Sequence, residues 1–431
     1  MQSDQQRPQI LVLGTCDTKL AETLFLREQI VQNGACRVLL LDIGSTPVQH
    51  RDIDVSCADL AAADANADAS LSELPRAEYI KHTIARATAY VRDLYVRGQM
   101  HGIVAAGGSS GTALATAVMR DALPVGFPKL MVSTMASGNV KPFVEETDIT
   151  LMYSVVDIAG ANTILGQILA NAAGAIVGAT LAYYSRLNTS QNKNLDAKGK
   201  KRVGITMFGV TTPCVDAIRA HLEEKHAHEY EVYVFHATGA GGKAMERLVR
   251  ERQLDAVLDM TTTEIADELV GGVLSAGPDR LTAAAKAGIP QVISVGACDM
   301  VNFGPRETVP ATFGNRRLHE HNPAVTLMRT SPEECTRIAD FIASKLRAHA
   351  SRPDLIRVLL PTGGISMIST PGQPFHDPEA DSALFVGLEK QLEGSGIEVR
   401  RDDRAINDAE FAVLAAESLI ELIRRSEANT V

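Results

Sequence analysis

Several patterns that would assign a function class are missing from this sequence. Its 431 residues include no tryptophan, and aromatic residues make up only 4%. The six cysteines are scattered without a C-x-x-C pair, so we expect neither a zinc site nor a disulfide framework. Residues 1–8 lack the charged-then-apolar order of a secretion signal, and we therefore expect a cytoplasmic protein.

Basic patches and convincing membrane spans are also missing. The net charge is −10 and is spread over both halves of the chain, so we expect no nucleic-acid partner. Residues 164–184 carry no charge and are as long as a membrane span, but Gln167, Asn171 and several glycines dilute their hydrophobicity. We expect no membrane partner and interpret this stretch as a helix buried between domains or between subunits.

The chain does contain a repeated alternation of strands and helices. Apolar runs alternate with helical stripes, and the same order starts again near residue 202. The first-half runs cover residues 9–13, 37–41, 102–106, 129–132 and 148–156. This alternation predicts an α/β fold of two doubly wound, Rossmann-like domains with mainly parallel sheets.

The length of the chain fits two domains. We expect an N-terminal α/β domain in residues 1–186, a linker in residues 187–201 and a C-terminal α/β domain in residues 202–431, because residues 186–201 are polar and show no apolar periodicity. Residues 45–74 are polar and without periodicity, which predicts a long loop over the carboxyl ends of the strands.

A glycine-rich turn follows the apolar run at residues 102–106. Gly107, Gly108 and Gly111, together with Ser109 and Thr112, lead directly into a helix. Glycines let the backbone approach a ligand closely, and N–H groups at a helix N-terminus favour a phosphate. The spacing matches neither G-x-x-x-x-G-K-[ST] nor G-x-G-x-x-G, so it specifies no nucleotide family. The alternative is a tight turn between a buried strand and a close-packed helix.

Asp17, Thr18 and Lys19 follow the first strand. Lys19 is suited to neutralise a phosphate, and Asp17 is suited to hold magnesium directly or through water. The alternative is that Asp17 and Thr18 only cap the following helix.

Other polar turns end the second, fourth and fifth strands. Ser133 and Thr134 join the expected cofactor-binding set, and Asp157 is a second candidate for magnesium or for a ribose hydroxyl. Asp157 can equally cap the next helix. Asp42 stands where dinucleotide-binding folds place an acid for the ribose, although the fingerprint glycines are absent.

The C-terminal half offers a second set of candidates. His319, Glu320 and His321 form its densest cluster of ligand-type side chains, and Arg316 beside them is suited to hold an acidic substrate. Without a third ligand at a known spacing, a polar loop is the alternative. Glu264 and Asp299 follow two further strands.

A proline-rich loop brings one more candidate base. His376 and Asp377 follow Pro371 and Pro374 and are expected opposite the turn at Thr362 to Gly364. His376 is a candidate general acid or base, and Asp377 is equally a helix cap. The candidate catalytic set is therefore His319, His376, Asp299 and Arg316.

Several blocks of sequence together resemble a known family. They are Gly14-Thr-x-Asp17-Thr-Lys19, Ala106-Gly-Gly108-Ser-x-Gly111-Thr112, Ser133-Thr-Met-x-Ser137-Gly138, Val156-Asp157-Ile, Gly271-Gly-Val-Leu-Ser-Ala-Gly277-Pro-Asp-Arg280 and Pro361-Thr-Gly-Gly-Ile-Ser366. In this order, over nearly the whole chain, they resemble the ATP-binding family typified by the tomato mosaic virus resistance protein of plants, which has uncharacterised bacterial members. The resemblance implies an ATP-binding N-terminal domain, a C-terminal domain of unassigned chemistry, and a homodimer or higher homo-oligomer. It does not imply viral resistance.

Two functions remain as hypotheses at this point. The first is an ATP- and magnesium-dependent enzyme that acts on a small acidic metabolite, with both domains contributing to one shared cavity. The second is a nucleotide-sensing protein in which ATP stabilises an oligomer or a partner surface without chemistry.

Overall fold

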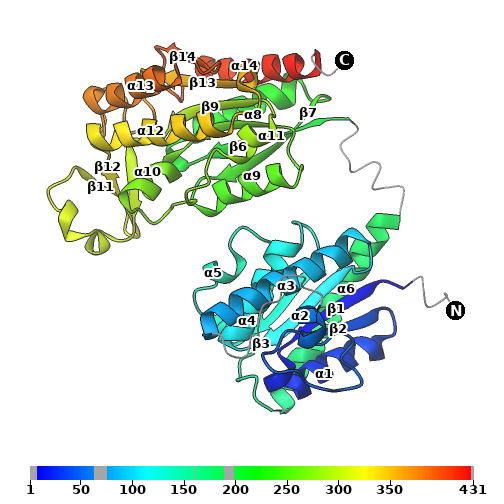
Figure 1. Ribbon diagram of the computed structural model, residues 1–431. Coiled ribbons are helices and arrows are strands. Elements are labelled where there is room, and N and C mark those ends of the chain that lie inside the picture. Colours follow the sequence, from blue (N-terminus) through cyan, green and yellow to red (C-terminus); the bar gives the residue numbers. More distant parts are fainter. Residues whose placement is uncertain (1–6, 63–74, 161, 189–198, 429–431) are drawn as a thin grey trace. The chain divides into compact units, whose positions relative to one another are not determined.

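The computed structural model describes residues 7–62, 75–160, 162–188 and 199–428 (Figure 1). The chain divides into two compact units, Met1–Leu195 and Asp196–Val431, each of which is described by itself. Most of the linker expected at residues 187–201 lies outside the described residues.

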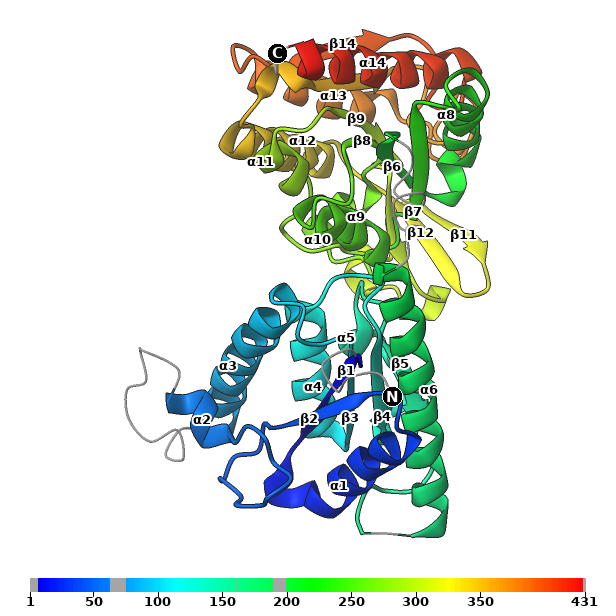
Figure 2. The same ribbon diagram turned by 90° about the vertical axis from the view of Figure 1, so that its right-hand side faces the viewer.

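The first unit is built on a five-stranded parallel sheet in the order β2-β1-β3-β4-β5 (Figure 2). Its strands are β1 (Gln9–Gly14), β2 (Arg37–Asp42), β3 (Gly102–Gly107), β4 (Lys129–Ser133) and β5 (Thr150–Tyr153). Apolar runs form the central strands β1, β3 and β4 because a parallel sheet covered on both faces buries the side chains of its inner strands. The α/β fold class predicted from the sequence is confirmed.

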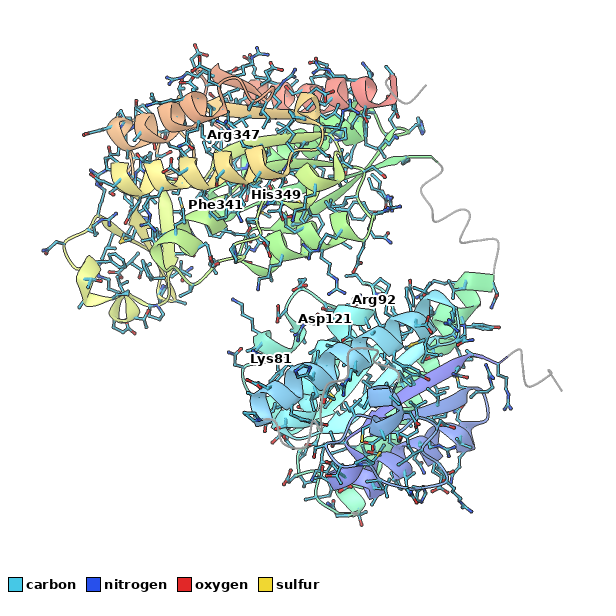
Figure 3. The ribbon with its side chains drawn as sticks, in the orientation of Figure 1. Lys81, Arg92, Asp121, Phe341, Arg347 and His349 are labelled. Atoms are coloured by element: carbon cyan, nitrogen blue, oxygen red, sulfur yellow. The ribbon has the colours of Figure 1, made fainter. Side chains whose placement is uncertain are left out.

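Helices cover both faces of this sheet. Helices α1 (Cys16–Asn33) and α6 (Thr163–Asn188) pack together on one face, and α3 (Arg76–Val96) and α4 (Ser109–Ala122) pack on the other. Arg92 of α3 donates a hydrogen bond to the carbonyl of Asp121 in α4 (Figure 3). The remaining short elements are α2 (Cys57–Ala62), η3 (Thr134–Ser137) and α5 (Lys141–Val144).

Helix α2 corrects the expectation of a continuous loop at residues 45–74. It is a single short helix whose one buried side chain is Leu60, so its apolar face is too small to give a periodic signal. Residues 63–74 lie outside the described residues.

The second unit contains a six-stranded parallel sheet in the order β14-β13-β9-β8-β6-β7. Its strands are β6 (Lys201–Met207), β7 (Tyr230–His236), β8 (Ala256–Thr261), β9 (Gln291–Gly296), β13 (Ile356–Pro361) and β14 (Glu398–Asp402). The first strand in sequence lies between the second and the third, as it does in the first unit, so both units wind in the same way.

Two layers of helices enclose this second sheet. Helices α8 (Thr212–Lys225) and α14 (Ala409–Ala428) share one face. The other face carries α9 (Ala240–Arg250), α10 (Thr263–Val270), α11 (Ala283–Ala287), α12 (Pro332–His349) and α13 (Pro378–Leu392). Helices α12 and α13 lie side by side, and Arg347 donates to the carbonyl of Gln391 across them (Figure 3).

A small antiparallel sheet was not expected from the sequence. It consists of β10 (Met300–Phe303), β12 (Val325–Arg329) and β11 (Leu318–Asn322) in that order. Its strands are only four or five residues long, which is too short for a clear alternation of apolar and polar residues. Pro305 and Pro310, in the connection from β10 to β11, also argue against a strand there.

A fully buried arginine organises one end of the second unit. Arg280 makes two hydrogen bonds to Asp259, at 2.6 and 2.7 Å, and one to Glu264 at 2.7 Å. Glu246 lies 3.5 Å away and accepts the backbone N–H groups of Leu281 and Ala283. The network therefore fastens β8, α9, α10 and the segment before α11 to one guanidinium group.

We predict that Arg280→Met strongly destabilises the second unit. The change leaves Asp259, Glu264 and Glu246 buried without a cation, which typically costs about 3–5 kcal/mol. Burial already raises the pKa values of Glu246 and Glu264, so these groups can take up protons in the variant and part of the loss should be recovered as the pH falls.

Urea unfolding of both proteins at pH 7 and pH 5.5 measures the effect. Arg352→Met is the control, because Arg352 pairs with Asp354 in an exposed ion pair, and such pairs contribute little to stability. An Arg280 variant that is as stable as the control would contradict the role assigned to the network.

Candidate functional site

The first unit has a cavity of about 630 Å³ at the carboxyl ends of β1, β2 and β3. In a sheet of order 2-1-3-4-5, the connections after β1 and β3 leave toward opposite faces, which opens a crevice between the two strands. The cavity lies in this crevice. Its lining comes from the turns after three strands and from helices α1, α3 and α4. The lining residues are Thr15, Asp17, Thr18, Lys19, Ile43, Gly44, Ser45, Tyr79, Ile80, Gly108, Ser109, Ser110, Gly111 and Leu114.

The glycine-rich turn forms one wall of the cavity. Gly107 ends β3, Gly108 is the N-cap of α4, and Gly111 lies in the first helical turn. A Cβ on Gly107 would lie 3.1 Å from the Cα of Gly111, so close packing explains the first glycine. A Cβ on Gly111 would meet no described atom within 4 Å, although alanine favours a helix over glycine by about 1 kcal/mol. Close packing therefore does not explain why residue 111 is a glycine. The absence of a side chain at Gly111 leaves space at the N-terminus of α4.

Two hydroxyls of the expected phosphate cradle lie behind this wall. Thr112 and Ser133 are both fully buried, and their hydroxyl oxygens lie 2.6 Å apart. Ser133 also accepts the N–H of Met135 at 2.9 Å. These groups fasten the end of β4 to α4 and do not line the cavity. Thr134 is half-buried. It lies beside the turn, since its hydroxyl oxygen would be 3.9 Å from a Cβ built on Gly108.

Asp17 holds the turn after β2 against the start of α1. One of its carboxylate oxygens accepts the N–H of Ser45 at 2.7 Å and the hydroxyl of the same residue at 2.6 Å. The other oxygen has only a 3.5 Å contact with the Thr18 hydroxyl. Asp17 is therefore partly engaged in the protein and keeps one oxygen for a ligand.

Lys19 lies at a break in helix α1, where its φ is −131° and its ψ is 31°. Its ammonium group forms no ion pair with any residue that the structure describes, while its side chain lines the cavity. A cation without a partner in a cavity favours an anionic ligand.

Asp42 supports the turns and does not face the cavity, which corrects its interpretation as a ribose ligand. It is fully buried, and one oxygen accepts the N–H groups of Cys16 at 3.0 Å and Gly44 at 2.8 Å. Burial raises the pKa of its carboxyl group, and these backbone hydrogen bonds oppose the rise. The residue aligns the ends of β1 and β2.

Asp157 is separated from this arrangement. It lies in the exposed turn after β5 and is not among the residues lining the cavity, so the structure does not bring it together with Asp17. The two magnesium candidates expected from the sequence therefore do not line the same cavity.

Several lining residues were missed by the sequence analysis. Tyr79 and Ile80 come from α3, and Leu114 comes from the second turn of α4. The Tyr79 hydroxyl donates to the carbonyl of Gly44 at 2.7 Å. No motif marks these residues, because their chain neighbours are ordinary helix residues.

The equivalent crevice in the second unit is filled. Val210, after β6, packs with Ala297, Met300, Leu327 and Phe375 in a buried apolar cluster. The hydroxyl-bearing residues at the end of β8, Thr261 and Thr262, are also fully buried. The antiparallel sheet and the loop before α13 thus occupy the place where the first unit has its cavity.

Three candidates of the second unit are engaged in internal contacts. Arg316 donates to both oxygens of Glu334, at 2.9 and 2.7 Å, and Glu264 belongs to the Arg280 network. Asp299 is fully buried and accepts the hydroxyl of Ser366 at 2.7 Å, and burial raises its pKa to about 6. Arg316 and Asp299, two members of the candidate catalytic set, are therefore bonded inside the fold of the second unit.

His319, Glu320 and His321 lie on β11, at the edge of the antiparallel sheet, and not in a loop. The ring of His319 packs against Phe375 with the ring centres 6.1 Å apart. Among the described residues, the group of three side chains close enough to share a metal ion is a different one, formed by His221, His226 and Glu417.

His376 lines a smaller cavity of about 240 Å³ together with the turn at Thr362 to Gly364. The structure thus brings the proline-rich loop opposite this turn. Asp377 accepts the N–H of Ala380 at 3.2 Å and is the N-cap of α13, which was its alternative interpretation.

Comparison with known proteins shows one family over nearly the whole chain. Residues 8–185 match the N-terminal domain, and residues 200–423 match the C-terminal domain, of an uncharacterised protein family, UPF0261. A UPF0261 protein of Clostridium tetani is 42% identical over 418 residues, covering 96% of this chain and 99% of the relative. A UPF0261 protein of Rhizobium meliloti is 43% identical over 410 residues, covering 94% and 97%.

A plant protein and a solved structure extend the comparison. The ToMV resistance protein Tm-1 of Solanum lycopersicum is 38% identical over 443 residues, which span 97% of this chain and 56% of the tomato protein. The structure of a UDP-N-acetylglucosamine 2-epimerase aligns with 67% of this chain and 79% of its own, at 12% identity and a TM-score of 0.18. A score this low carries no argument about function.

We predict that Asp42 acts through its backbone contacts. Asp42→Ala should lower the free energy of unfolding of the first unit by about 1–3 kcal/mol, because the N–H groups of Cys16 and Gly44 lose their acceptor. Asp42→Asn keeps that acceptor and replaces an oxygen that has no partner in the described structure, so its effect should be much smaller. Chemical denaturation measures both. Equal losses in the two variants would show that the charge of Asp42 matters.

Proposed function

We propose a nucleotide-binding function for this chain, which belongs to the uncharacterised protein family UPF0261. The proposed ligand is ATP with magnesium. The observation that carries the proposal is the cavity in the crevice between β1 and β3. It is lined by the first turn of α4 and by Lys19, which forms no ion pair with a described residue. Its volume of about 630 Å³ lies within the usual range for small-molecule sites.

The lining of the cavity combines the two kinds of group that a nucleotide requires. Lys19, Ser109 and the backbone at Gly108 and Gly111 suit phosphate groups. Ile43, Tyr79, Ile80 and Leu114 are largely apolar and suit a base.

Asp17 is the residue that would hold magnesium. Mg²⁺ is usually bound by one or two carboxylates together with phosphate oxygens, and the open oxygen of Asp17 fits the first of these roles. The bound ion would neutralise phosphate charge. A second carboxylate is not required, so the position of Asp157 does not conflict with the proposal.

An ATP-dependent enzyme acting on a small acidic metabolite is the first version of this function. The second version, a nucleotide sensor without chemistry, is favoured by one observation: Arg316 and Asp299, two of the four expected catalytic side chains, are bonded inside the fold. For either version we propose a cytoplasmic protein, and all six cysteines have free thiols.

Helix α6 supports the proposal of a homo-oligomer. It is long and apolar enough to cross a membrane by length and composition, but Leu165, Leu169, Ile176 and Val177 pack onto the sheet as in a core helix. Its outer side exposes further apolar residues, Ile164, Leu181 and Leu187. Covering them with a second copy would remove apolar surface from water.

We predict opposite effects of Gly111→Ala on stability and on binding. The added methyl group meets no described atom, so the first unit should gain about 0.5–1 kcal/mol from better helix propensity. The same methyl group enters the space reserved for phosphate, so ATP affinity should fall at least about tenfold, which is about 1.4 kcal/mol.

Ala113→Gly is the matched control for this experiment. Ala113 is exposed in the same helix and does not line the cavity, so the change should cost a similar amount of stability and leave ATP affinity intact. Thermal unfolding and isothermal titration with Mg-ATP supply the two measurements. Unchanged ATP affinity in Gly111→Ala would place the nucleotide elsewhere.

The enzyme and the sensor differ in turnover. An enzyme should release ADP from ATP when a panel of small carboxylic acids is added, and Lys19→Met should abolish this release by removing the phosphate-side cation. A sensor should bind ATP and change its sedimentation behaviour with no ADP formed. Analysis of the same samples by anion-exchange chromatography and by analytical ultracentrifugation distinguishes the two.

A further inference from the structure

The second unit has its own cavity, which lies at the carboxyl end of β13 and not in the crevice filled by the apolar cluster. It is lined by the Thr362 to Gly364 turn, by His376, and by Asp381, Ser382 and Phe385 on the first turns of α13. Its volume of about 240 Å³ corresponds to roughly eight water molecules at about 30 Å³ each, which suits a molecule the size of a monosaccharide.

The loop that carries His376 is fixed by two arginines. Arg329 donates to the carbonyl of Phe375 at 2.9 Å and to the carbonyl of Asp377 at 3.2 Å. Arg317 donates to the carbonyl of His376 at 3.0 Å. Three consecutive carbonyls are thus held by guanidinium groups, while the Phe375 side chain is fully buried. A loop held in this way presents His376 in one position, as a preorganised site requires.

A hydrogen bond also fixes the ring of His376. Its Nδ1 lies 3.1 Å from the carbonyl oxygen of Ser369. A carbonyl oxygen only accepts hydrogen bonds, so Nδ1 carries the proton in the neutral ring. The lone pair is therefore on Nε2, which makes that atom a hydrogen-bond acceptor.

Asp381 supplies a second acceptor to the same cavity. One of its oxygens accepts from Arg329 at 2.6 Å. The other makes no hydrogen bond with a described residue and is not fully enclosed, although Asp381 as a whole is only 7% exposed. A nearly buried carboxylate with one free oxygen in a cavity lacks the partner that such groups normally have.

The charges around the cavity are already balanced. Asp381 is paired with Arg329, and Arg401 at the rim is paired with Glu389 through two hydrogen bonds. The Thr362 hydroxyl donates to the carbonyl of Asp402, so it too can only accept from a ligand. The cavity therefore calls for hydrogen-bond donors without a net charge, which is the chemistry of hydroxyl groups.

We propose that this cavity binds a small uncharged polyol, such as a monosaccharide, whose hydroxyls donate to His376 Nε2 and to the free oxygen of Asp381. Phe385 provides an apolar surface for the carbon side of the ligand. The proposal stands on the second unit alone and does not depend on nucleotide binding in the first.

Ligand-observed NMR on the full chain tests the proposal. D-ribose, D-xylose, D-glucose and myo-inositol serve as probes, and at least one should show saturation transfer from the protein. Ser382→Phe places a bulky ring at the exposed rim and should abolish the signal. Val386→Phe, one helical turn further along and outside the lining, should keep it.

Each result has a definite meaning. No transfer to any of the four probes, or equal transfer with Ser382→Phe and the native protein, overturns the proposal. His376→Gln should weaken binding of the responding probe at least about tenfold, because the acceptor at the Nε2 position becomes an amide; an unchanged affinity also overturns it. ATP titration of the same variants distinguishes this failure from a failure of the nucleotide proposal.

The ring state of His376 can be checked separately. Long-range ¹H–¹⁵N NMR of the free protein above neutral pH should show the His376 proton on Nδ1. A proton on Nε2 would contradict the assigned acceptor and remove the basis for polyol binding.

Discussion

The order of strands is the constraint on which both candidate sites depend. In each unit, the first strand lies inside the parallel sheet with the second strand on one side and the third on the other. Helical connections must then leave toward opposite faces, and every polar turn ends at the same edge. The first unit keeps the resulting crevice open, and the second fills it with apolar side chains. Two units of the same winding therefore have their cavities at different places along the sheet.

The second unit uses much of its charge for structure. Arg280 joins Asp259, Glu264 and Glu246 inside the fold, and Arg329 joins Asp381 to the loop before α13. Buried arginines suit this role because one guanidinium group satisfies several acceptors at fixed angles. In the cavity of the first unit, by contrast, Lys19 forms no ion pair with a described residue, and one oxygen of Asp17 has only a 3.5 Å contact with the Thr18 hydroxyl. Charged side chains that bind other residues of the fold support its structure, whereas those without such a partner among the described residues are the candidate ligands.

The two cavities also differ in the kind of ligand they favour. The first combines apolar side chains with a helix N-terminus and with a lysine that has no ion-pair partner among the described residues, which suits an anion attached to a base. The second combines paired charges with acceptors to which no described residue donates, which suits hydroxyl groups. Because each cavity is lined by residues of one unit, either proposal can fail without affecting the other.

The sequence by itself determined the fold class and much of the first site. Apolar runs set the strands, and because parallel strands share one carboxyl edge, Asp17, Lys19 and the glycines around Gly108 could be placed together before any coordinates. Only the tertiary structure decided which polar side chains are left without a hydrogen-bond or ion-pair partner among the described residues. Asp42, Ser133, Arg316 and Glu264 look like ligands in the sequence, but partners 16 to 26 residues away engage them. Sequence patterns record residue type and local spacing, whereas the engagement of a side chain depends on neighbours that only folding brings within hydrogen-bond distance.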